Sequence, residues 1–268
     1  MLGSDMTVSS ARYGTQQLPL AGTSLHFLKG GSGPPCVVLH GIEGPEGWLA
    51  FHDALADHAT VYAPSHPGYG LTAAPPWITA VQHQAVFYNW FLQHIDGAVD
   101  LIGVGLGGWI AATMAVMCEA QLRHLVLVDA VGVRPAQDDI FDIFVAPWKE
   151  VIDRGFFDAS HSEEYQRIYG SQPIVEFGGT RESGRVMSMR MCFKPYMYDP
   201  ALPAMLRKLR VPTLIAWGAD DRIVPVECAG LYQQAIPHAR LELLEGCGHF
   251  AHLEQPRRLA KLVAEFIA

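Results

Sequence analysis

The sequence has few charged residues, no run of basic residues and no long apolar stretch. Charged residues make up 17% of its 268 positions, and 19 lysines and arginines face 27 aspartates and glutamates, a formal net charge of −8. This acidic balance argues against nucleic acid or an anionic membrane surface as a partner. No apolar stretch approaches the roughly 20 residues that cross a bilayer. We therefore expect neither nucleic acid nor a membrane among its partners.

Paired cysteines are also lacking. The five cysteines are scattered, odd in number and never spaced as C-x-x-C, so they predict neither a disulfide framework nor a zinc site. The histidines show no H-E-x-x-H spacing, and we expect no metal. The opening "MLGSDMTVSS" has no charged segment followed by an apolar one, as a secretion signal would have. These observations favour a cytoplasmic protein with reduced thiols.

What the chain does contain is apolar runs that alternate with helical patterns. Half of the residues are hydrophobic, which is typical of a compact globular protein. The pattern predicts an edge strand at 23–31 and buried strands at 34–41, 59–70, 98–105, 123–130, 211–218 and 239–246. Helices are expected at 47–58, 80–95, from 107, from 226 and at 256–268. Such regular alternation predicts an α/β fold with a mostly parallel central sheet flanked by helices.

The alternation stops between residues 133 and 206. This segment is irregular, rich in Phe, Met, Tyr and Trp, and shows no buried strand. We interpret it as an inserted cap. The predicted division is a leader and edge segment at 1–23, a core at 24–132 and 207–268, and a cap at 133–206.

The stretch "DLIGVGLGGWIAATMA" at 100–115 permits two interpretations. Gly103, Gly105 and Gly108 match the G-x-G-x-x-G dinucleotide fingerprint, and Asp129 follows at the distance of its ribose-binding acid. The same residues match G-x-S-x-G, the strand-to-helix turn that presents a nucleophilic serine, with Gly105 at the serine position. Two strand–helix units precede this stretch, whereas a dinucleotide fingerprint normally opens its fold. The second interpretation is therefore favoured.

Three further stretches support it. "VVLHGIEG", "LIAWGADDRIVP" and "GCGHFAHLEQP", together with the glycine-rich turn, resemble the ordered motifs of the α/β-hydrolase family, from about residue 24 to the C-terminus. "APSHPGYG" and "GLGGWIAA" are similar to its branch of bacterial esterases, lactonases and carbon–carbon bond hydrolases. The resemblance implies an α/β-hydrolase fold with an inserted helical cap, no cofactor, and a small ester or lactone as substrate.

The resemblance also assigns roles to residues. Asp221 would orient His249, and His249 would act as general base and then as general acid. The backbone N–H groups of Ile42 and Leu106 would bind the oxyanion. Gly105 stands at the position of the nucleophile.

Several other residues near these motifs are candidates for the site, and some of them have two possible roles. Glu43 either contacts substrate in the pocket or caps the helix after Gly47. His40 and His66 are expected to be structural. Apolar residues of the cap either line a substrate pocket or form the core of the cap itself: Trp148, Phe156, Phe157, Met187, Met189, Met191, Phe193 and Tyr196.

Gly105 has no atom that can attack a carbonyl group, but it fits a strained turn that costs other residues about 1–3 kcal/mol. Either glycine replaces a serine of the natural protein, or glycine is native and the His249–Asp221 pair serves another purpose. If glycine is native, the protein is a carbon–carbon bond hydrolase, a lyase-like or cofactor-free enzyme, or a ligand-binding protein. The sequence predicts a carboxylic-ester hydrolase of the acyl-enzyme type, much reduced in activity by the missing serine.

Overall fold

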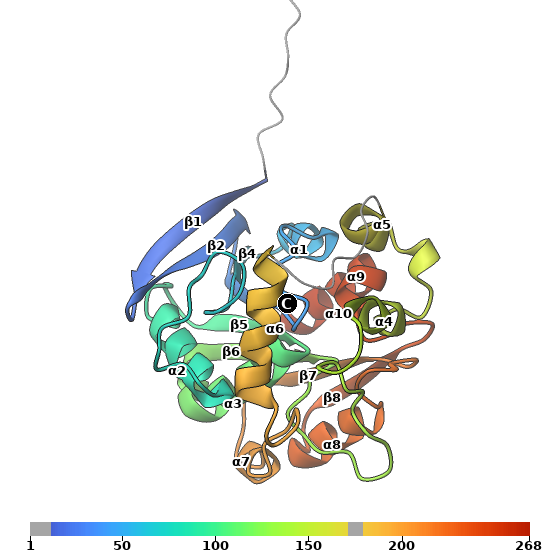
Figure 1. Ribbon diagram of the computed structural model, residues 1–268. Helices are drawn as coiled ribbons and strands as arrows, with labels where there is room; N and C mark the ends of the chain where they lie inside the picture. Colours follow the sequence, from blue (N-terminus) through green and yellow to red (C-terminus); the bar gives the residue numbers. More distant parts are fainter. Residues whose placement is uncertain (1–11, 171–178) are drawn as a thin grey trace, which may run out of the picture.

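The computed structural model describes residues 12–170 and 179–268, and in them an eight-stranded sheet forms the centre of the protein (Figure 1). The strand order is β1-β2-β4-β3-β5-β6-β7-β8. Strands β3 to β8 run parallel, and β1 and β2 form an antiparallel extension at one edge. The strands are β1 (Tyr13–Leu20), β2 (Thr23–Gly31), β3 (Pro35–Leu39), β4 (Thr60–Pro64), β5 (Val99–Val104), β6 (Leu122–Val128), β7 (Thr213–Gly218) and β8 (Arg240–Leu244). The predicted α/β fold with a mostly parallel sheet is confirmed.

The central strands are buried on both faces, which explains their unbroken apolar runs. Every residue of β5 and β7 is buried. The prediction that 23–31 forms the edge strand is wrong, because β2 pairs with β1 on one side and with β4 on the other. Strand β1 is mostly exposed and carries few apolar residues, so the hydrophobic pattern did not reveal it.

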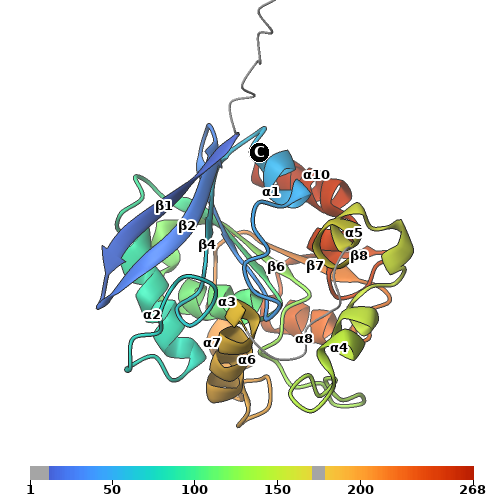
Figure 2. The same cartoon turned by 45° about the horizontal axis from the view of Figure 1, so that its top comes forward.

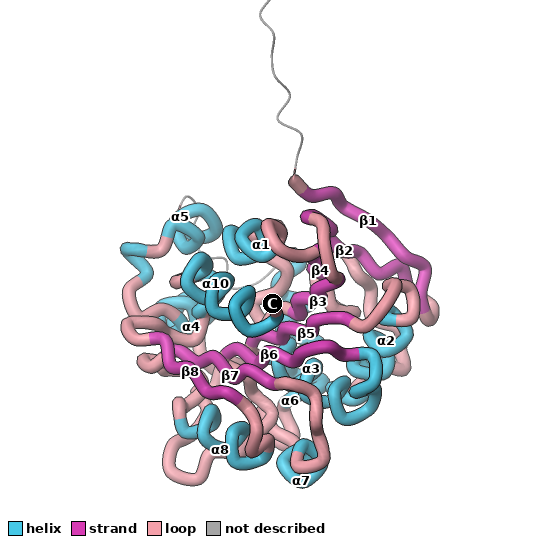
Figure 3. The backbone as a smooth tube through the Cα atoms, turned by 180° about the vertical axis from the view of Figure 1, so that it is seen from behind, coloured by secondary structure: helices cyan, strands magenta, loops and turns pink. Residues whose placement is uncertain are grey.

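Helices cover both faces of the sheet (Figure 3). Helices α1 (Ala50–Leu55) and α10 (Pro256–Ile267) lie on one face. On the other lie α2 (Val81–Leu92), α3 (Leu106–Cys118) and α8 (Glu227–Ala235). Helix α1 is shorter than the predicted 47–58. No helix in the described residues has the length and hydrophobicity of a membrane span.

The segment whose sequence pattern is irregular contains helices, in agreement with the helical segment that the family resemblance implies. These are α4 (Trp148–Gly155), α5 (Glu163–Tyr169), α6 (Gly179–Cys192) and α7 (Leu202–Leu206). Helix α6 crosses in front of the central strands in Figure 1, and α4 and α5 lie away from it, on the side of α9 (Ala251–Glu254) and α10 (Figures 1 and 2). Three of these helices have only 5 to 8 residues, too few for a sustained period in the sequence, whereas α6 has 14. The division into core and cap stays a prediction, and residues 171–178 of the predicted cap lie outside the described residues.

The glycines at the end of β5 and in the first turn of α3 permit close packing between β5, α3 and the end of β3. A Cβ on Gly103 would lie 2.2 Å from the carbonyl oxygen of Gly107, and one on Gly107 would lie 2.2 Å from that of Leu39. A Cβ on Gly108 would lie 2.5 Å from the Cβ of Ala130. Helix packing therefore accounts for the glycine spacing that also matches the dinucleotide fingerprint.

Candidate active site

Gly105 occupies a sharp bend between β5 and α3. Its φ of 51° and ψ of −112° lie in a region that glycine adopts most easily. Its N–H donates to the carbonyl oxygen of Val128 at 2.9 Å, and its own carbonyl oxygen accepts from the N–H of Val131 at 3.2 Å. These bonds tie the bend to both sides of the end of β6.

Asp221 and His249, predicted as the acid and the histidine of the site, are hydrogen-bonded to each other. Asp221 Oδ2 lies 2.8 Å from His249 Nδ1, and both side chains are at most 5% exposed. Asp221 Oδ1 accepts hydrogen bonds from the N–H groups of Ile223 and Val224, each at 2.8 Å. The carboxylate is thus fixed in the loop after β7, and it fixes the imidazole ring in turn.

The other ring nitrogen of His249 lies toward Gly105. A Cβ on Gly105 would lie 3.4 Å from His249 Nε2 and 3.6 Å from the Cα of Gly41. Burial lowers the pKa of His249, but the charge and the hydrogen bond of Asp221 outweigh it and raise the pKa to about 9. The imidazole is therefore a strong base once it is neutral.

The predicted oxyanion donors come from the ends of β3 and β5. Leu106 is the first residue of α3, where an N–H has no acceptor within the helix. Among the hydrogen bonds of the described residues, none uses the N–H of Ile42 or of Leu106. Gly41, next to Ile42, is in contact range of the Gly105 bend. The binding of an oxyanion by these two amides stays a prediction.

His40 and His66 form a hydrogen-bonded support behind the loop that follows β3. His40 Nε2 accepts from the N–H of His66 at 3.0 Å, and His66 Nε2 lies 2.9 Å from the carbonyl oxygen of His40. His66 Nδ1 bonds the hydroxyl of Tyr88. Burial lowers the pKa of His40 to about 4. These contacts fit the structural role expected for both histidines.

Glu43 does not cap the helix after Gly47, so that interpretation is wrong. The N–H of Ala50 at the start of α1 bonds Glu164 instead. The Glu43 carboxylate is 2% exposed and faces inward. Its Oε1 accepts from the N–H of Gly41 at 3.0 Å and lies 3.3 Å from His252 Nε2. A role of Glu43 toward substrate stays a prediction.

Asp129 was singled out only for the dinucleotide interpretation, and the structure places it beside the Asp221–His249 pair. It is fully buried, and its Oδ1 accepts from the N–H of Gly218 at 2.7 Å. Burial and the charge of Asp221 raise its pKa well above the ordinary value, although His249 opposes this. Its φ of 48° is rare for a residue with a side chain. Its position at the end of a strand next to β7 was the available signal.

The apolar residues of the cap divide into buried and exposed sets. Trp148, Phe156, Met187 and Met191 are buried, whereas Phe157, Met189 and Phe193 are exposed. The hydroxyl of Tyr196 donates to the carbonyl oxygen of Phe141 at 2.7 Å. The buried set packs with the core of the molecule. Substrate contacts of Trp148 and Met191 stay predictions.

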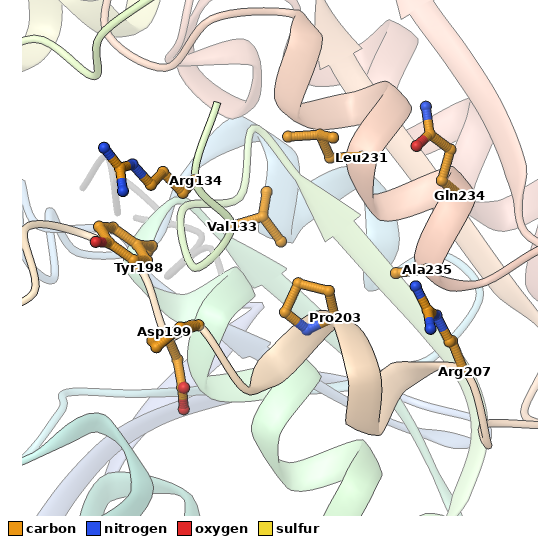
Figure 4. Close-up of a pocket in the computed structure, with 10 residues that line it drawn as sticks. Val133, Arg134, Tyr198, Asp199, Pro203, Arg207, Leu231, Gln234 and Ala235 are labelled. Carbon is orange, nitrogen blue, oxygen red and sulfur yellow. The ribbon is translucent and has the colours of Figure 1, made fainter. Parts of the chain in front are cut away.

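A surface pocket of about 370 Å³ lies between α7, α8 and the chain that follows β6 (Figure 4). Tyr198 and Arg134 stand at one side and Arg207 and Gln234 at the other. None of the residues predicted for the site lines it. Among the described residues, no group of three or more His, Cys, Asp or Glu side chains could hold a metal ion.

With this geometry in view, sequence comparison matches residues 36–262 to the alpha/beta hydrolase family. The chain belongs to this family. It is 30% identical to 2-hydroxy-6-oxo-2,4-heptadienoate hydrolase of Pseudomonas putida, over 98% of this chain and 99% of that protein. It is 24% identical to human monoacylglycerol lipase ABHD6, over 89% of this chain and 76% of the lipase.

Solved structures of this family share the fold. A serine hydrolase of carbazole degradation superposes with a TM-score of 0.79 at 23% identity, covering 95% of this chain and 98% of that one. The 2-hydroxy-6-oxo-6-phenylhexa-2,4-dienoate hydrolase of a Rhodococcus strain also reaches 0.79, at 22% identity and with the same coverage. The chain is thus an alpha/beta hydrolase whose predicted nucleophile position holds glycine.

Proposed function

We propose that this alpha/beta hydrolase hydrolyses a carbonyl compound with water activated by His249. The observation that carries the proposal is the buried His249–Asp221 hydrogen bond, with His249 Nε2 directed at a residue that has no side chain. A general base must come within hydrogen-bond reach of the proton that it removes, directly or through one water. Glycine leaves room for a water beside Nε2, where a serine would otherwise stand.

For the substrate class we propose 2-hydroxy-6-oxo-dienoates. Two of the relatives named above, those of Pseudomonas putida and of the Rhodococcus strain, are hydrolases of such compounds, and their names describe a ketone and a carboxylate but no ester. Hydrolysis at the ketone must therefore break a carbon–carbon bond.

The proposed reaction is balanced by one water. Neutral His249 takes a proton from water while the water oxygen bonds to the carbonyl carbon, and the N–H groups of Ile42 and Leu106 bind the resulting oxyanion. The bond to be broken must have an acceptor for its electron pair, so the substrate reacts as its keto tautomer, in which the 2-hydroxyl proton has moved to C5. The oxyanion then re-forms the carbonyl double bond, and the electron pair of the breaking C5–C6 bond passes through C3=C4 to the oxygen on C2. That oxygen takes the proton from His249. The products are a carboxylic acid and a 2-hydroxydienoate, and His249 returns to its neutral form.

The test uses 2-hydroxy-6-oxohepta-2,4-dienoate, whose conjugated absorbance disappears on cleavage. We expect slow turnover by the chain as it stands, and loss of that turnover in His249→Gln and Asp221→Asn. His161→Gln is the control, because its side chain is 85% exposed and far from the pair in sequence and role. Turnover that is unchanged in His249→Gln would overturn the proposal.

A second candidate is ester hydrolysis by the acyl-enzyme route with serine at position 105. It is favoured by the space at that position, since a Cβ there would meet its neighbours at 3.4 Å and 3.6 Å, which are ordinary contacts. Gly105→Ser should raise p-nitrophenyl ester turnover by several orders of magnitude, because an enzyme without its nucleophile keeps only about 10³–10⁴-fold catalysis over water. A serine codon in the source gene would identify glycine as a replacement. A Gly105→Ser protein that is inert on both esters and dienoates would contradict this candidate.

A further inference from the structure

A second histidine–carboxylate pair lies beside the candidate site and was not part of the sequence prediction. Glu43 and His252 have side chains 2% and 5% exposed, with Oε1 and Nε2 3.3 Å apart. The same Oε1 accepts the N–H of Gly41 at 3.0 Å. Burial opposes ionisation of Glu43, but the hydrogen bond and the charge of His252 outweigh it and lower the pKa of the carboxyl group. Glu43 is therefore a buried carboxylate with defined partners.

Gly41 permits this arrangement because it has no Cβ. A Cβ on Gly41 would lie 2.2 Å from Glu43 Oε2 and 2.9 Å from the carboxyl carbon. The carboxylate thus occupies the place of a side chain on its own loop. On its other side, the Cα of Gly41 lies 3.6 Å from a Cβ placed on Gly105. Gly41 therefore lies between the Glu43 carboxylate and the side-chain position of residue 105.

The pair joins the two loops that carry the predicted site. Glu43 follows Ile42 directly, and His252 comes three residues after His249. At the Gly41–Gly44 turn, the carbonyl oxygen of Gly41 bonds the N–H of Gly44 at 3.4 Å and lies 2.7 Å from His40 Nδ1. The Glu43 contacts add a bond to the N–H of Gly41 and a link to the other loop.

We propose that Glu43 is a positioning residue for the oxyanion site, which it builds by bonding Gly41 and anchoring the turn to His252. The inference rests on the proposed function. By accepting the N–H of Gly41, the carboxylate shapes the turn so that the N–H of Ile42 stays free for a substrate oxygen. By holding His252, it sets the spacing between that amide and His249. Glu43 itself takes no part in proton transfer.

Two kinetic assays test this role. One measures p-nitrophenyl ester hydrolysis by Gly105→Ser, and the other measures dienoate hydrolysis by the protein that retains Gly105. Glu43→Ala should lower kcat about 10²-fold with little change in KM, since one oxyanion donor contributes about 10²–10³ in rate. Glu43→Gln keeps an acceptor oxygen for Gly41 and should retain most of kcat. His252→Ala should resemble Glu43→Ala, and the double variant should be little worse than either single one.

Asp100→Ala supplies a matched control. Asp100 is also a buried carboxylate, 1% exposed, and its Oδ1 lies 2.8 Å from His124 Nδ1. It stands at the far end of β5 from Gly105. This variant should lose stability as Glu43→Ala does, and keep kcat. The inference would be overturned if the kcat of Glu43→Gln were as low as that of Glu43→Ala. It would also be overturned if Glu43→Ala kept the kcat of the control.

An NMR measurement separates failure of the inference from failure of the proposed function. In ¹H–¹⁵N spectra of the full chain, Glu43→Ala should shift the amide signals of Gly41 and Ile42 and the ring signals of His249, and Asp100→Ala should leave them in place. If those signals shift and no variant hydrolyses any substrate, the proposed function fails while the link between the loops stands. If they do not shift, the inference fails whatever the activity.

Discussion

At the scale of single residues, His249 is buried between the charge of Asp221 and the empty side-chain position of Gly105. The raised pKa means that the ring is mostly protonated at neutral pH, and a base must be neutral to accept a proton. We expect kcat/KM of the chain, and of Gly105→Ser, to rise with pH through about 9. An ordinary histidine would give a midpoint near 6.5. A pH profile from 5.5 to 10 measures this, and a plateau above pH 7 would contradict it.

Asp129 is expected to reduce stability at high pH. Its raised pKa means that the folded state holds the proton more tightly than the unfolded chain, so its stabilising contribution is present below about 3.8 and lost as pH rises. Asp129→Asn keeps an acceptor for Gly218 and cannot ionise. The melting temperature of this variant relative to wild type should therefore increase between pH 5 and pH 8.

Asp158→Asn is the control for this measurement, because the pKa of Asp158 is shifted in the opposite direction. Hydrogen bonds from Ser160 and His161 lower the pKa of Asp158, so this exposed carboxylate adds stability above about 3.8. That contribution is already complete at pH 5, and the effect of the replacement on the melting temperature should therefore stay constant between pH 5 and pH 8. A pH-independent difference for Asp129→Asn would refute the argument.

At the scale of elements, the join between β5 and α3 tolerates no side chain at Gly107. Its Cβ would lie 2.2 Å from a backbone oxygen of β3, so the helix or the strand must shift. Gly107→Ala should lower the free energy of unfolding by about 1–3 kcal/mol or more. Gly230→Ala in α8 is the control, because nothing lies within 4 Å of its Cβ position, and alanine there should add about 0.4–1 kcal/mol. Urea denaturation of both variants measures the difference.

At the scale of the whole molecule, Glu254 joins the segment after α4 to the loop that carries His249. Its carboxylate accepts the N–H groups of Phe157 at 3.0 Å, Asp158 at 2.7 Å and Gly248 at 2.7 Å. Phe157 and Asp158 are 97 and 96 residues from Glu254 in the chain. The structure thus uses one side chain to connect the two segments.

Glu254→Ala should leave all three donors without their acceptor and cost about 1–3 kcal/mol of stability. Amide hydrogen exchange should become faster at residues 156–158 and 248–249. Glu242→Ala is the control, since in the described part of the chain its carboxylate pairs with the exposed side chain of Arg240 on β8 and with no other cation. Equal exchange rates in the two variants would show that Glu254 does not hold the segments together.

The sequence alone determined the fold class, the strand–helix order of the core and the order of the motifs. Continuous apolar runs mark buried parallel strands because both faces of such strands are covered, and the glycines mark bends and close packing through their missing Cβ. The pairing of Asp221 with His249 followed from motifs near the ends of β7 and β8. The fold class and the strand–helix order depend on residues close in sequence. The pairing depends on family motifs whose acid and histidine are expected to bond each other.

Only the tertiary structure decided the partners of Glu43, the place of Asp129 and the position of β2 inside the sheet instead of at its edge. Each depends on a contact between distant segments: Glu43 with His252, Asp129 with Gly218, and β2 with a polar strand at the edge. A carboxylate in a loop has the same local pattern whether it meets water, a helix end or a histidine. The fold chooses among these by bringing the ends of parallel strands to one edge of the sheet, where side chains far apart in the chain become neighbours.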